Sequence, residues 1–402
     1  MALKRSNFFV DKDQQLKDNL ILDITDLHVN FKVKDGILHA VRGIDLKVER
    51  SSIVGIVGES GSGKSVSVKS IIGFNDNAQT KAKLMNFKNV DITKLKKHQW
   101  KYYRGTYVSY ISQDPLFSLN PTMTIGKQVK EAIYVASKRR YFQAKSDLKF
   151  ALSNKEIDKK TYKSKLKEIK QTYQQKIKPI NVEKKTLEIL QFIGINDAKK
   201  RLKAFPSEFS GGMRQRIVIA IAVATEPDLI IADEPTTALD VTIQAKVLTL
   251  IKQLRDLLNI TIIFISHNIS LIANFCDFVY VMYAGKIVEQ GLVEEIFTNP
   301  LHPYTWALIS SIPEQKDKNK PLTSIPGVIP NMLTPPKGDA FASRNQYALA
   351  IDFEYHPPFF EVTKTHKAAT WLLHPQAPKV EPPQAVIDNI TLTKKALQFK
   401  DQ

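Results

Sequence analysis

The sequence predicts an α/β fold with a parallel sheet at its centre, followed by a loop-rich C-terminal extension. Three short runs rich in β-branched residues, 53–57, 229–232 and 261–265, are typical of strands buried on both faces of such a sheet. A glycine-rich loop with the pattern G-x-x-x-x-G-K-S follows the first run directly. Fourteen of the 20 prolines come after residue 299, which indicates that the chain leaves the α/β core there.

Composition excludes several classes of protein. Hydrophobic residues make up 43% of the 402, so a sizeable core is available and wholesale disorder is excluded. The single cysteine, Cys276, excludes an intrachain disulfide and a Cys-rich zinc or iron–sulfur site. The longest aliphatic run, 217–224, is far short of the roughly 20 residues that span a bilayer. The first residues lack the apolar stretch of a signal peptide, so we expect a soluble protein of a reducing compartment.

The net charge of +18 is concentrated in one segment. Residues 138–178 contain fourteen Lys and Arg and four acidic residues. The net charge of this segment is therefore more than half of the net charge of the chain. The segment has no Gly or Pro, and its sparse apolar residues recur at helical spacing, so it predicts one or two solvated helices. The basic balance leaves nucleic acid, an anionic membrane surface and phosphate ligands open as partners.

The glycine-rich loop after the first strand predicts a nucleotide site. Its glycines let backbone N–H groups face phosphate oxygens, Lys64 adds a charge for the β- and γ-phosphates, and the Ser65 hydroxyl can bind Mg²⁺. The helix that follows adds its N-terminal dipole. A chance match in a Gly/Ser-rich turn is the alternative, and the flanking strand and helix argue against it. The predicted residues are Gly58, Glu59, Ser60, Gly61, Ser62, Gly63, Lys64 and Ser65.

Further motifs follow in order along the chain. A Ser-Gly-Gly element begins at Ser210 and opens an apolar helix, and the strand at 229–232 ends in two adjacent acids. We expect Asp233 to hold Mg²⁺ through water and Glu234 to polarise an attacking water. A histidine at the end of a strand, such as His267, is by itself more often structural than catalytic.

Together with Gln113 and His267, this ordered set resembles the ATP-binding-cassette (ABC) ATPases over about residues 19–300. The resemblance implies a P-loop NTPase core with a mixed sheet, an antiparallel β subdomain and a helical lid. The domains that we expect are a tail at 1–18, the ATPase at 19–300 with its lid at about 114–225 and a Lys-rich insertion at about 138–178, and a Pro-rich extension at 301–402.

The resemblance also implies roles for single residues. Phe31 would stack on adenine, unless it is an ordinary strand aromatic. Gln113 would reach Mg²⁺ or the water and hinge the lid, Glu234 would be the general base, and His267 would contact the γ-phosphate. Asp240 would lie at a dimer seam.

The Ser-Gly-Gly element matches the family's signature, which caps ATP bound to the opposite cassette. One chain then carries halves of two composite sites, so hydrolysis should require a dimer. Phe precedes the element and Met follows it, where the commonest form of the signature has Leu and Gln. The Ser-Gly-Gly that touches phosphate is intact. We therefore expect full ATPase activity at the site that this signature completes. The signature residues are Ser210, Gly211, Gly212 and Met213.

Longer stretches resemble the oligopeptide/dipeptide importer ATPases, and most closely one ATPase subunit of oligopeptide permease. The resemblance extends to about residue 373. It implies an ATPase, with ATP and Mg²⁺ as cofactors, that powers oligopeptide uptake from the cytoplasmic face of the plasma membrane. Its partners would be an OppF-type second ATPase, two transmembrane permease subunits and an extracellular peptide-binding lipoprotein. Dipeptides, nickel or another small solute remain alternatives. The stretches are 113–121, 209–216, 233–241, 281–285 and 302–305.

Two departures from this subfamily stand out. Relatives often carry four cysteines in the extension, thought to hold an iron–sulfur cluster. Without them we expect no cluster and an extension held by packing alone. The second departure is the insertion at 138–178, which is either a solvated helical insertion or a contact with anionic lipid headgroups. The residues at the cysteine positions are Asp339, Asn345, Asp352 and Thr370.

Two rival classes fit less well. Nucleic-acid cassettes need zinc-binding cysteines, long coiled coils or two cassettes in one chain, and none of these is present, so we expect no nucleic-acid partner. P-loop kinases and GTPases lack the Ser-Gly-Gly element before the acid pair.

Overall fold

The computed structural model describes residues 19–237, 239–312 and 325–398, and the chain divides into two compact units. The first unit comprises 19–22, 49–51 and 86–262, and the second comprises 23–48, 52–85 and the rest of the described chain from 263. The predicted tail at 1–18 lies outside the described residues. In the part that the structure describes, no helix is both long enough and apolar enough to cross a membrane.

A mixed sheet lies at the centre of the second unit. Its strands are β3 (Ile53–Val57), β9 (Thr261–Ser266), β10 (Phe278–Tyr283), β11 (Lys286–Leu292), β12 (Phe360–Glu361) and β13 (Lys367–Ala368). They lie in the order β12-β13-β11-β10-β3-β9. The β3–β10 pair is parallel, whereas β11, β13 and β12 add in antiparallel fashion. Every residue of β3 and β9 is buried, as expected for strands covered on both faces.

An antiparallel sheet and several helices complete the second unit. Strand β1 pairs with β4, with Phe31 opposite Ala78. Helix α1 follows β3, and the C-terminal extension adds short helices joined by loops, as its proline content predicts. These elements are β1 (Leu20–Val33), β2 (Gly36–Glu49), β4 (Ala78–Lys81), α1 (Lys64–Ile71), α10 (Ile269–Phe275), α11 (Val293–Thr298), α12 (Pro303–Ser310), η5 (Ala342–Arg344), α13 (Ala350–Glu354), η6 (Trp371–Leu373) and α14 (Gln384–Gln398).

The first unit is mostly helical around a short parallel pair. The pair is formed by β7 (Val108–Ile111) and β8 (Leu229–Asp233), and β8 is buried along its whole length. The predicted strands at 53–57, 229–232 and 261–265 are therefore all confirmed, as β3, β8 and β9. The other elements are β5 (Leu84–Phe87), β6 (Val90–Asp91), η3 (Ile92–Lys94), α2 (Lys97–Tyr103), α3 (Pro115–Ser118), α4 (Ile125–Ser153), α5 (Lys159–Lys176), α6 (Pro179–Phe192), α7 (Ala198–Arg201), η4 (Pro206–Glu208), α8 (Gly211–Ala224) and α9 (Val241–Leu258).

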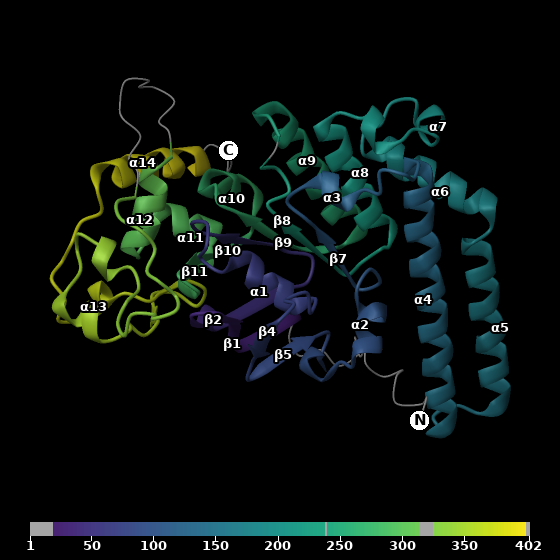
Figure 1. Cartoon of the computed structure of the whole chain (residues 1–402), viewed down its shortest axis with the longest axis horizontal. Coiled ribbons are helices and arrows are strands. Elements are labelled where there is room, and N and C mark those ends of the chain that lie inside the picture. Colours follow the sequence, from purple (N-terminus) through teal and green to yellow (C-terminus); the bar gives the residue numbers. More distant parts are fainter. Residues whose placement is uncertain (1–18, 238, 313–324, 399–402) are drawn as a thin grey trace. The chain divides into compact units, whose positions relative to one another are not determined.

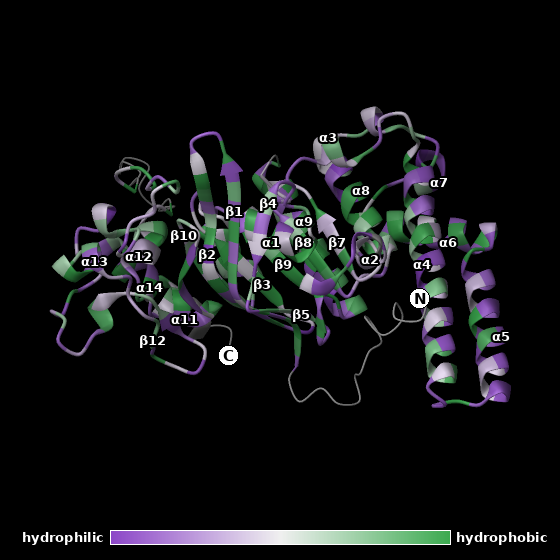
Figure 2. Cartoon of the chain, turned by 60° about the horizontal axis from the view of Figure 1, so that its bottom comes forward, coloured by the Kyte–Doolittle hydropathy of each residue, from purple (hydrophilic) through white to green (hydrophobic). Residues whose placement is uncertain are grey.

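The Lys-rich stretch 138–178 forms the second half of α4 and all of α5, which run side by side (Figure 1). Asp158 caps α5 by accepting a backbone hydrogen bond in its first turn, and Pro179 begins α6. Tyr141 of α4 stacks on Tyr173 of α5, with ring centroids 4.6 Å apart. No residue of α5 is buried, and Figure 2 shows its many hydrophilic residues, so the helix presents its charge to solvent.

Glu226, in the turn before β8, holds three helices of the first unit together. Its carboxylate contacts Lys185 of α6, Arg140 of α4 at 2.7 Å and Lys176 of α5 at 3.5 Å. Burial by itself would raise the pKa of Glu226, but Lys185 and the two other cations outweigh it and lower the pKa to about 2. The stabilisation is thus present above the usual pKa of a glutamate and is lost only as the pH falls towards 2. The basic helices are tied to the strand that carries the acid pair.

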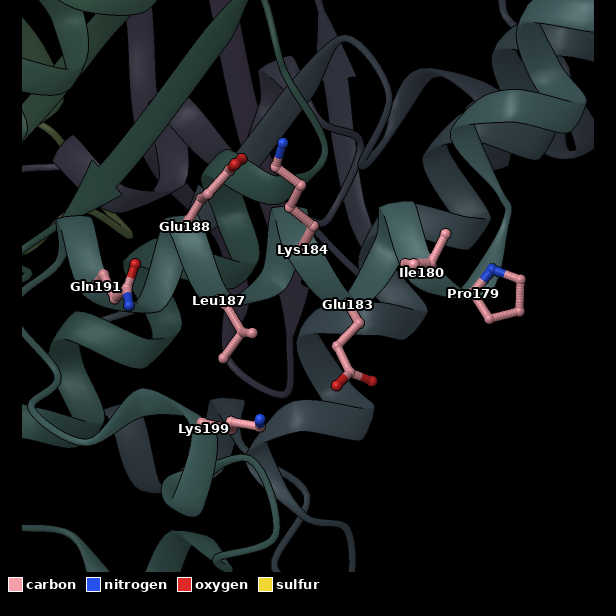
Figure 3. Close-up of a pocket in the computed structure, with 8 residues that line it drawn as sticks. All are labelled: Pro179, Ile180, Glu183, Lys184, Leu187, Glu188, Gln191 and Lys199. Atoms are coloured by element: carbon pink, nitrogen blue, oxygen red, sulfur yellow. The ribbon is translucent and has the colours of Figure 1, made fainter.

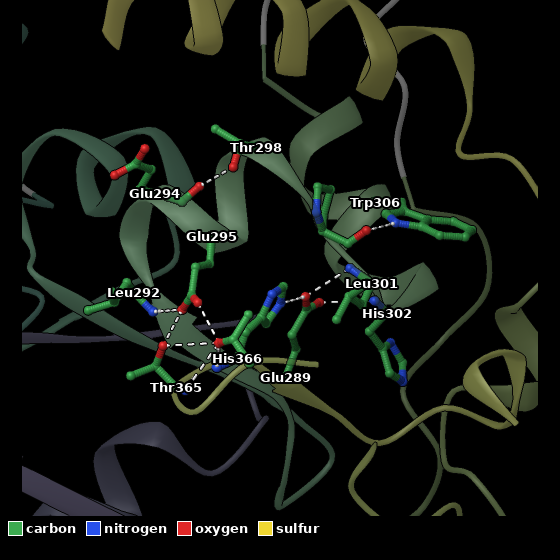
Figure 4. A network of polar contacts seen from close by, with 12 residues as sticks. Glu289, Leu292, Glu294, Glu295, Thr298, Leu301, His302, Trp306, Thr365 and His366 are labelled. Carbon is green, nitrogen blue, oxygen red and sulfur yellow. Dashed lines mark hydrogen bonds and ion pairs between the residues drawn. The ribbon is translucent and has the colours of Figure 1, made fainter. Parts of the chain in front are cut away.

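The C-terminal extension is held by polar contacts, so the expectation that packing alone holds it is wrong (Figure 4). Glu289 of β11 is fully buried and accepts two backbone N–H groups directly before α12, at 2.8 and 3.0 Å. The same carboxylate lies 2.8 Å from Nε2 of His366, which is also buried. Glu295 of α11 accepts the hydroxyl of Thr365 at 2.7 Å. A buried carboxylate needs such partners, and here they come from the extension.

Candidate nucleotide site

The predicted phosphate-binding loop connects β3 to α1, and close backbone approaches explain its glycines. A Cβ on Gly58 would lie 2.1 Å from the carbonyl oxygen of Met282, and a Cβ on Gly63 would lie 2.5 Å from that of Ala40. Gly63 also has a φ of +96°, in the left-handed region. Only glycine fits these positions without a shift of the loop.

Lys64 begins α1, and its side chain folds back over the loop. Its Nζ donates to the carbonyl oxygens of Gly58 at 2.7 Å and Glu59 at 2.8 Å, and the residue is only 5% exposed. Ser62 is fully buried beside it, and Ser65 is half-buried in the first turn of the helix. The loop therefore gathers a cation and a helix N-terminus in one place, which is the chemistry that phosphate binding needs.

Two further predicted residues of the second unit are placed as follows. Phe31 is half-buried on β1, and His267 is exposed directly after β9. Glu59, in contrast, does not extend freely from the loop, because its carboxylate forms an ion pair with Arg344 at 2.6 Å.

The predicted acid pair ends β8 in the first unit. Asp233 is 4% exposed, and its Oδ2 accepts a hydrogen bond from the Tyr110 hydroxyl at 2.6 Å. Glu234 follows with a left-handed φ of +49°. Its Oε2 accepts hydrogen bonds from Gln113 Nε2 at 3.1 Å and from the Thr237 hydroxyl at 3.0 Å. The structure thus brings Gln113 and Glu234 together, and a carboxylate oriented by two donors suits a general base.

Tyr110 is a residue that the sequence analysis missed. Burial, together with the hydrogen bond to Asp233, raises the pKa of Tyr110, so its hydroxyl stays protonated and donates to the carboxylate. Its position on β7, three residues before Gln113, is the only signal in the sequence, and no motif singles it out.

The signature residues open α8. Ser210 is the N-cap, and its hydroxyl oxygen accepts from the Met213 N–H at 3.4 Å. The two glycines differ in their surroundings. A Cβ on Gly212 would lie 2.6 Å from Ile243 of α9, whereas a Cβ on Gly211 would meet no atom within 4 Å. Gly212 is therefore required by packing, and Gly211 faces open space.

The predicted seam residue and the four cysteine-equivalent positions have a common local role. Each of these side chains accepts a hydrogen bond from a nearby backbone N–H. They are Asp240, Asp339, Asn345, Asp352 and Thr370. Burial raises the pKa of Asp339 to about 6. Over the described residues, no three or more His, Cys, Asp or Glu side chains are grouped as a metal site.

A pocket beside α6 contains none of the predicted nucleotide residues (Figure 3). Its lining mixes charged and apolar side chains, and Ile180 is 76% exposed. The residues that line it are Pro179, Ile180, Glu183, Lys184, Leu187, Glu188, Gln191 and Lys199. The predicted nucleotide residues therefore lie in the loops described above and outside this pocket.

Comparison with known proteins gives the family. The ABC transporter family matches residues 41–237, and the family described as the oligopeptide/dipeptide transporter C-terminal region matches 288–351. The oligopeptide transport ATP-binding protein OppD of Mycoplasma pneumoniae is 78% identical over 100% of this chain and 95% of its own. The chain belongs to the ATP-binding subunits of oligopeptide/dipeptide ABC importers. The predicted resemblance is confirmed, and the chain is an ABC-type ATPase.

More distant ABC proteins agree with this assignment. The dipeptide transport ATP-binding protein DppD of Lactococcus lactis is 44% identical over 92% of this chain and 96% of its own. The solved structure of the ATP-binding cassette MJ0796 bound to ADP and Pi has a TM-score of 0.52 at 21% identity and covers 68% of this chain and 98% of its own. This likeness confirms the predicted fold class, a P-loop NTPase core of the ABC type. Membership of the importer family favours the importer over the two rival classes.

Proposed function

We propose that this ABC importer ATPase hydrolyses ATP at the cytoplasmic face of the plasma membrane and so powers uptake of oligopeptides through partner permease subunits. The observation that carries the proposal is the 78% identity, along the whole chain, to a protein named for oligopeptide transport. The match of 288–351 to a family specific to oligopeptide and dipeptide transporters supports it.

The proposed residue roles are as follows. Phe31 stacks on adenine, and Gly58–Ser65 hold the phosphates. Lys64, positioned by the carbonyl oxygens of Gly58 and Glu59, binds β- and γ-phosphate oxygens. Glu234, held by Gln113 and Thr237, takes a proton from the attacking water, and His267 contacts the γ-phosphate.

The residues for Mg²⁺ fit a hard cation. They offer the Ser65 hydroxyl, the amide oxygen of Gln113 and the carboxylate of Asp233, and Mg²⁺ prefers oxygen ligands. Gln113 donates its amide N–H to Glu234, which leaves its amide oxygen available for the cation. When held by these residues, Mg²⁺ would supply neutralisation of the phosphate charge. Tyr110 fixes the orientation of Asp233 for this role.

The proposed assembly is a heterodimer with an OppF-type ATPase on two permease subunits, supplied by an extracellular peptide-binding lipoprotein. In it, Ser210 to Met213 cap the ATP of the partner ATPase, and Asp240 lies at the seam. The exposure of Gly211 supports a contact with another chain. Two bound ATP molecules favour a closed dimer, and hydrolysis reopens it.

The proposal is tested by reconstituting the chain with its permease partners in vesicles. ATP hydrolysis should rise when the peptide-loaded binding protein is present, and peptides longer than two residues should accumulate. The relative named for dipeptide transport makes dipeptides the second candidate. If only dipeptides stimulate ATP hydrolysis, the transported substrate is a dipeptide and not a longer peptide. Hydrolysis stimulated by nucleic acid, and not by any solute, would overturn the proposal.

The basic helix α5 provides a second contact, with anionic lipid headgroups beside the permease. Four of its exposed lysines, Lys163, Lys165, Lys167 and Lys170, lie within eight residues. A basic residue near an anionic surface contributes about 1 kcal/mol. Lys176 at the end of α5 lies 3.5 Å from the Glu226 carboxylate, so one lysine of this helix is paired within the first unit.

We predict that replacing these four lysines by Gln weakens binding of the chain to phosphatidylserine vesicles at least about tenfold at low salt. Deleting 138–178 is a poorer test, because α4 runs from residue 125 through that boundary. The control replaces four exposed lysines elsewhere and should change binding little: Lys32, Lys34, Lys81 and Lys83. Equal losses in both variants, or none in the first, would leave α5 as a solvated insertion.

A further inference from the structure

Two residues of the C-terminal extension contact the phosphate-binding loop. Arg344, at the end of η5, forms a two-pronged ion pair with Glu59, with Nη1–Oε2 and Nη2–Oε1 distances of 2.6 and 3.0 Å. The Tyr304 hydroxyl, on α12, accepts the backbone N–H of Glu59 at 2.7 Å. The extension therefore holds both the side chain and the backbone of one loop residue.

The guanidinium of Arg344 is itself fixed in place. Its Nε donates to the carbonyl oxygen of Pro326 at 2.6 Å, and its Nη1 donates to the Tyr283 hydroxyl at 3.1 Å. The side chain is only 3% exposed. A planar guanidinium held on several sides transmits its position to the carboxylate that it binds, which a flexible lysine cannot do.

The loop residue that Arg344 binds is hydrogen-bonded to Lys64. The carbonyl oxygen of Glu59 accepts a hydrogen bond from Lys64 Nζ at 2.8 Å. Ile329 of the extension also lies beside the tip of the loop, 3.9 Å from where a Cβ on Gly61 would be. The extension thus contacts the loop at Glu59 and lies beside Gly61, and the Glu59 carbonyl links this contact to Lys64.

We propose that Arg344 and Tyr304 are positioning residues for ATP binding, which hold the phosphate-binding loop in its binding conformation through Glu59. The C-terminal extension then contributes to ATP affinity by positioning the phosphate-binding loop. This inference rests on the proposed function of Gly58–Ser65 in binding ATP.

The test measures the affinity of the chain for a non-hydrolysable ATP analogue with Mg²⁺ by calorimetry. It also measures kcat and KM for ATP in the importer reconstituted with its partner subunits. R344A should weaken binding about tenfold and raise KM, with kcat at saturating ATP kept within about threefold. R344K should recover part of the lost affinity, because lysine supplies the positive charge but cannot bind both carboxylate oxygens in a fixed geometry as the guanidinium does. The double variant R344A/E59A should bind no more weakly than R344A, as expected for residues that act as a pair.

The matched control is K367A, which removes another ion pair of the extension, that with Glu361. It should leave affinity unchanged, while thermal melting reports the fold of every variant. R344A with affinity within twofold of the unmodified chain, or equal losses in R344A and K367A, would overturn the inference alone. An unmodified chain that does not bind the analogue would overturn the proposed function and the inference together.

Discussion

Replacing Glu234 by Gln should lower ATP turnover by about 10²- to 10⁴-fold, the range expected when a general base is lost, while ATP binding stays intact. The substitution is well matched to the geometry. Oε2 of Glu234 accepts from Gln113 and Thr237, and the amide oxygen of a glutamine can accept the same two hydrogen bonds. The turn after β8 should therefore keep its shape, and only the proton acceptor is removed.

The measurement compares kcat with the dissociation constant for ATP in the same protein. E188Q is the control, because Glu188 is an exposed carboxylate on α6 beside the pocket of Figure 3 and should change neither value. If E234Q loses ATP binding, or if its turnover falls less than threefold, Glu234 is not the base.

The sequence was sufficient for those parts of the fold and site that depend on local pattern. The buried strands are short runs of β-branched residues, and the phosphate-binding loop and the acid pair are contiguous motifs at strand ends. In each case the residues of the motif are contiguous in the sequence: Lys64 directly follows Gly63, and Glu234 directly follows the last residue of β8. Such features can be read without knowing the rest of the fold.

The residues that sequence reasoning missed act through contacts between distant parts of the chain. Arg344 and Glu59 are 285 positions apart, and Tyr110 and Asp233 are 123 apart. Neither Arg344 nor Tyr110 stands in a recognisable motif, and only the fold brings each to its partner.

The error about the extension has the same origin. The missing cysteines predict an extension held by packing alone. In the structure, Glu289 on β11 and His366, 77 positions later, form a buried polar contact that no sequence spacing indicates. A buried carboxylate on a strand was a weak hint, because such a group requires partners.

Gly63→Ala should raise the dissociation constant for ATP at least about tenfold, because the methyl group meets both a strained backbone and a close contact. At a φ of +96° an alanine costs about 1–3 kcal/mol. Its Cβ would also lie 2.5 Å from the carbonyl oxygen of Ala40, which belongs to β2 and has little freedom to move. The loop must shift, and Lys64, the next residue, shifts with it.

Gly36→Ala is the control that separates the effect of backbone strain from the effect of the close contact with Ala40. Gly36 also has a positive φ, +139°, but a Cβ there meets no atom within 4 Å. This variant should lose some stability on thermal melting and bind ATP like the unmodified chain. If Gly63→Ala binds ATP equally well, the close approach to β2 is not what shapes the loop. If both variants lose affinity for ATP equally, backbone strain at a positive φ controls ATP binding and the contact with Ala40 does not. A loss confined to Gly63→Ala assigns the affinity to the backbone geometry that places Lys64.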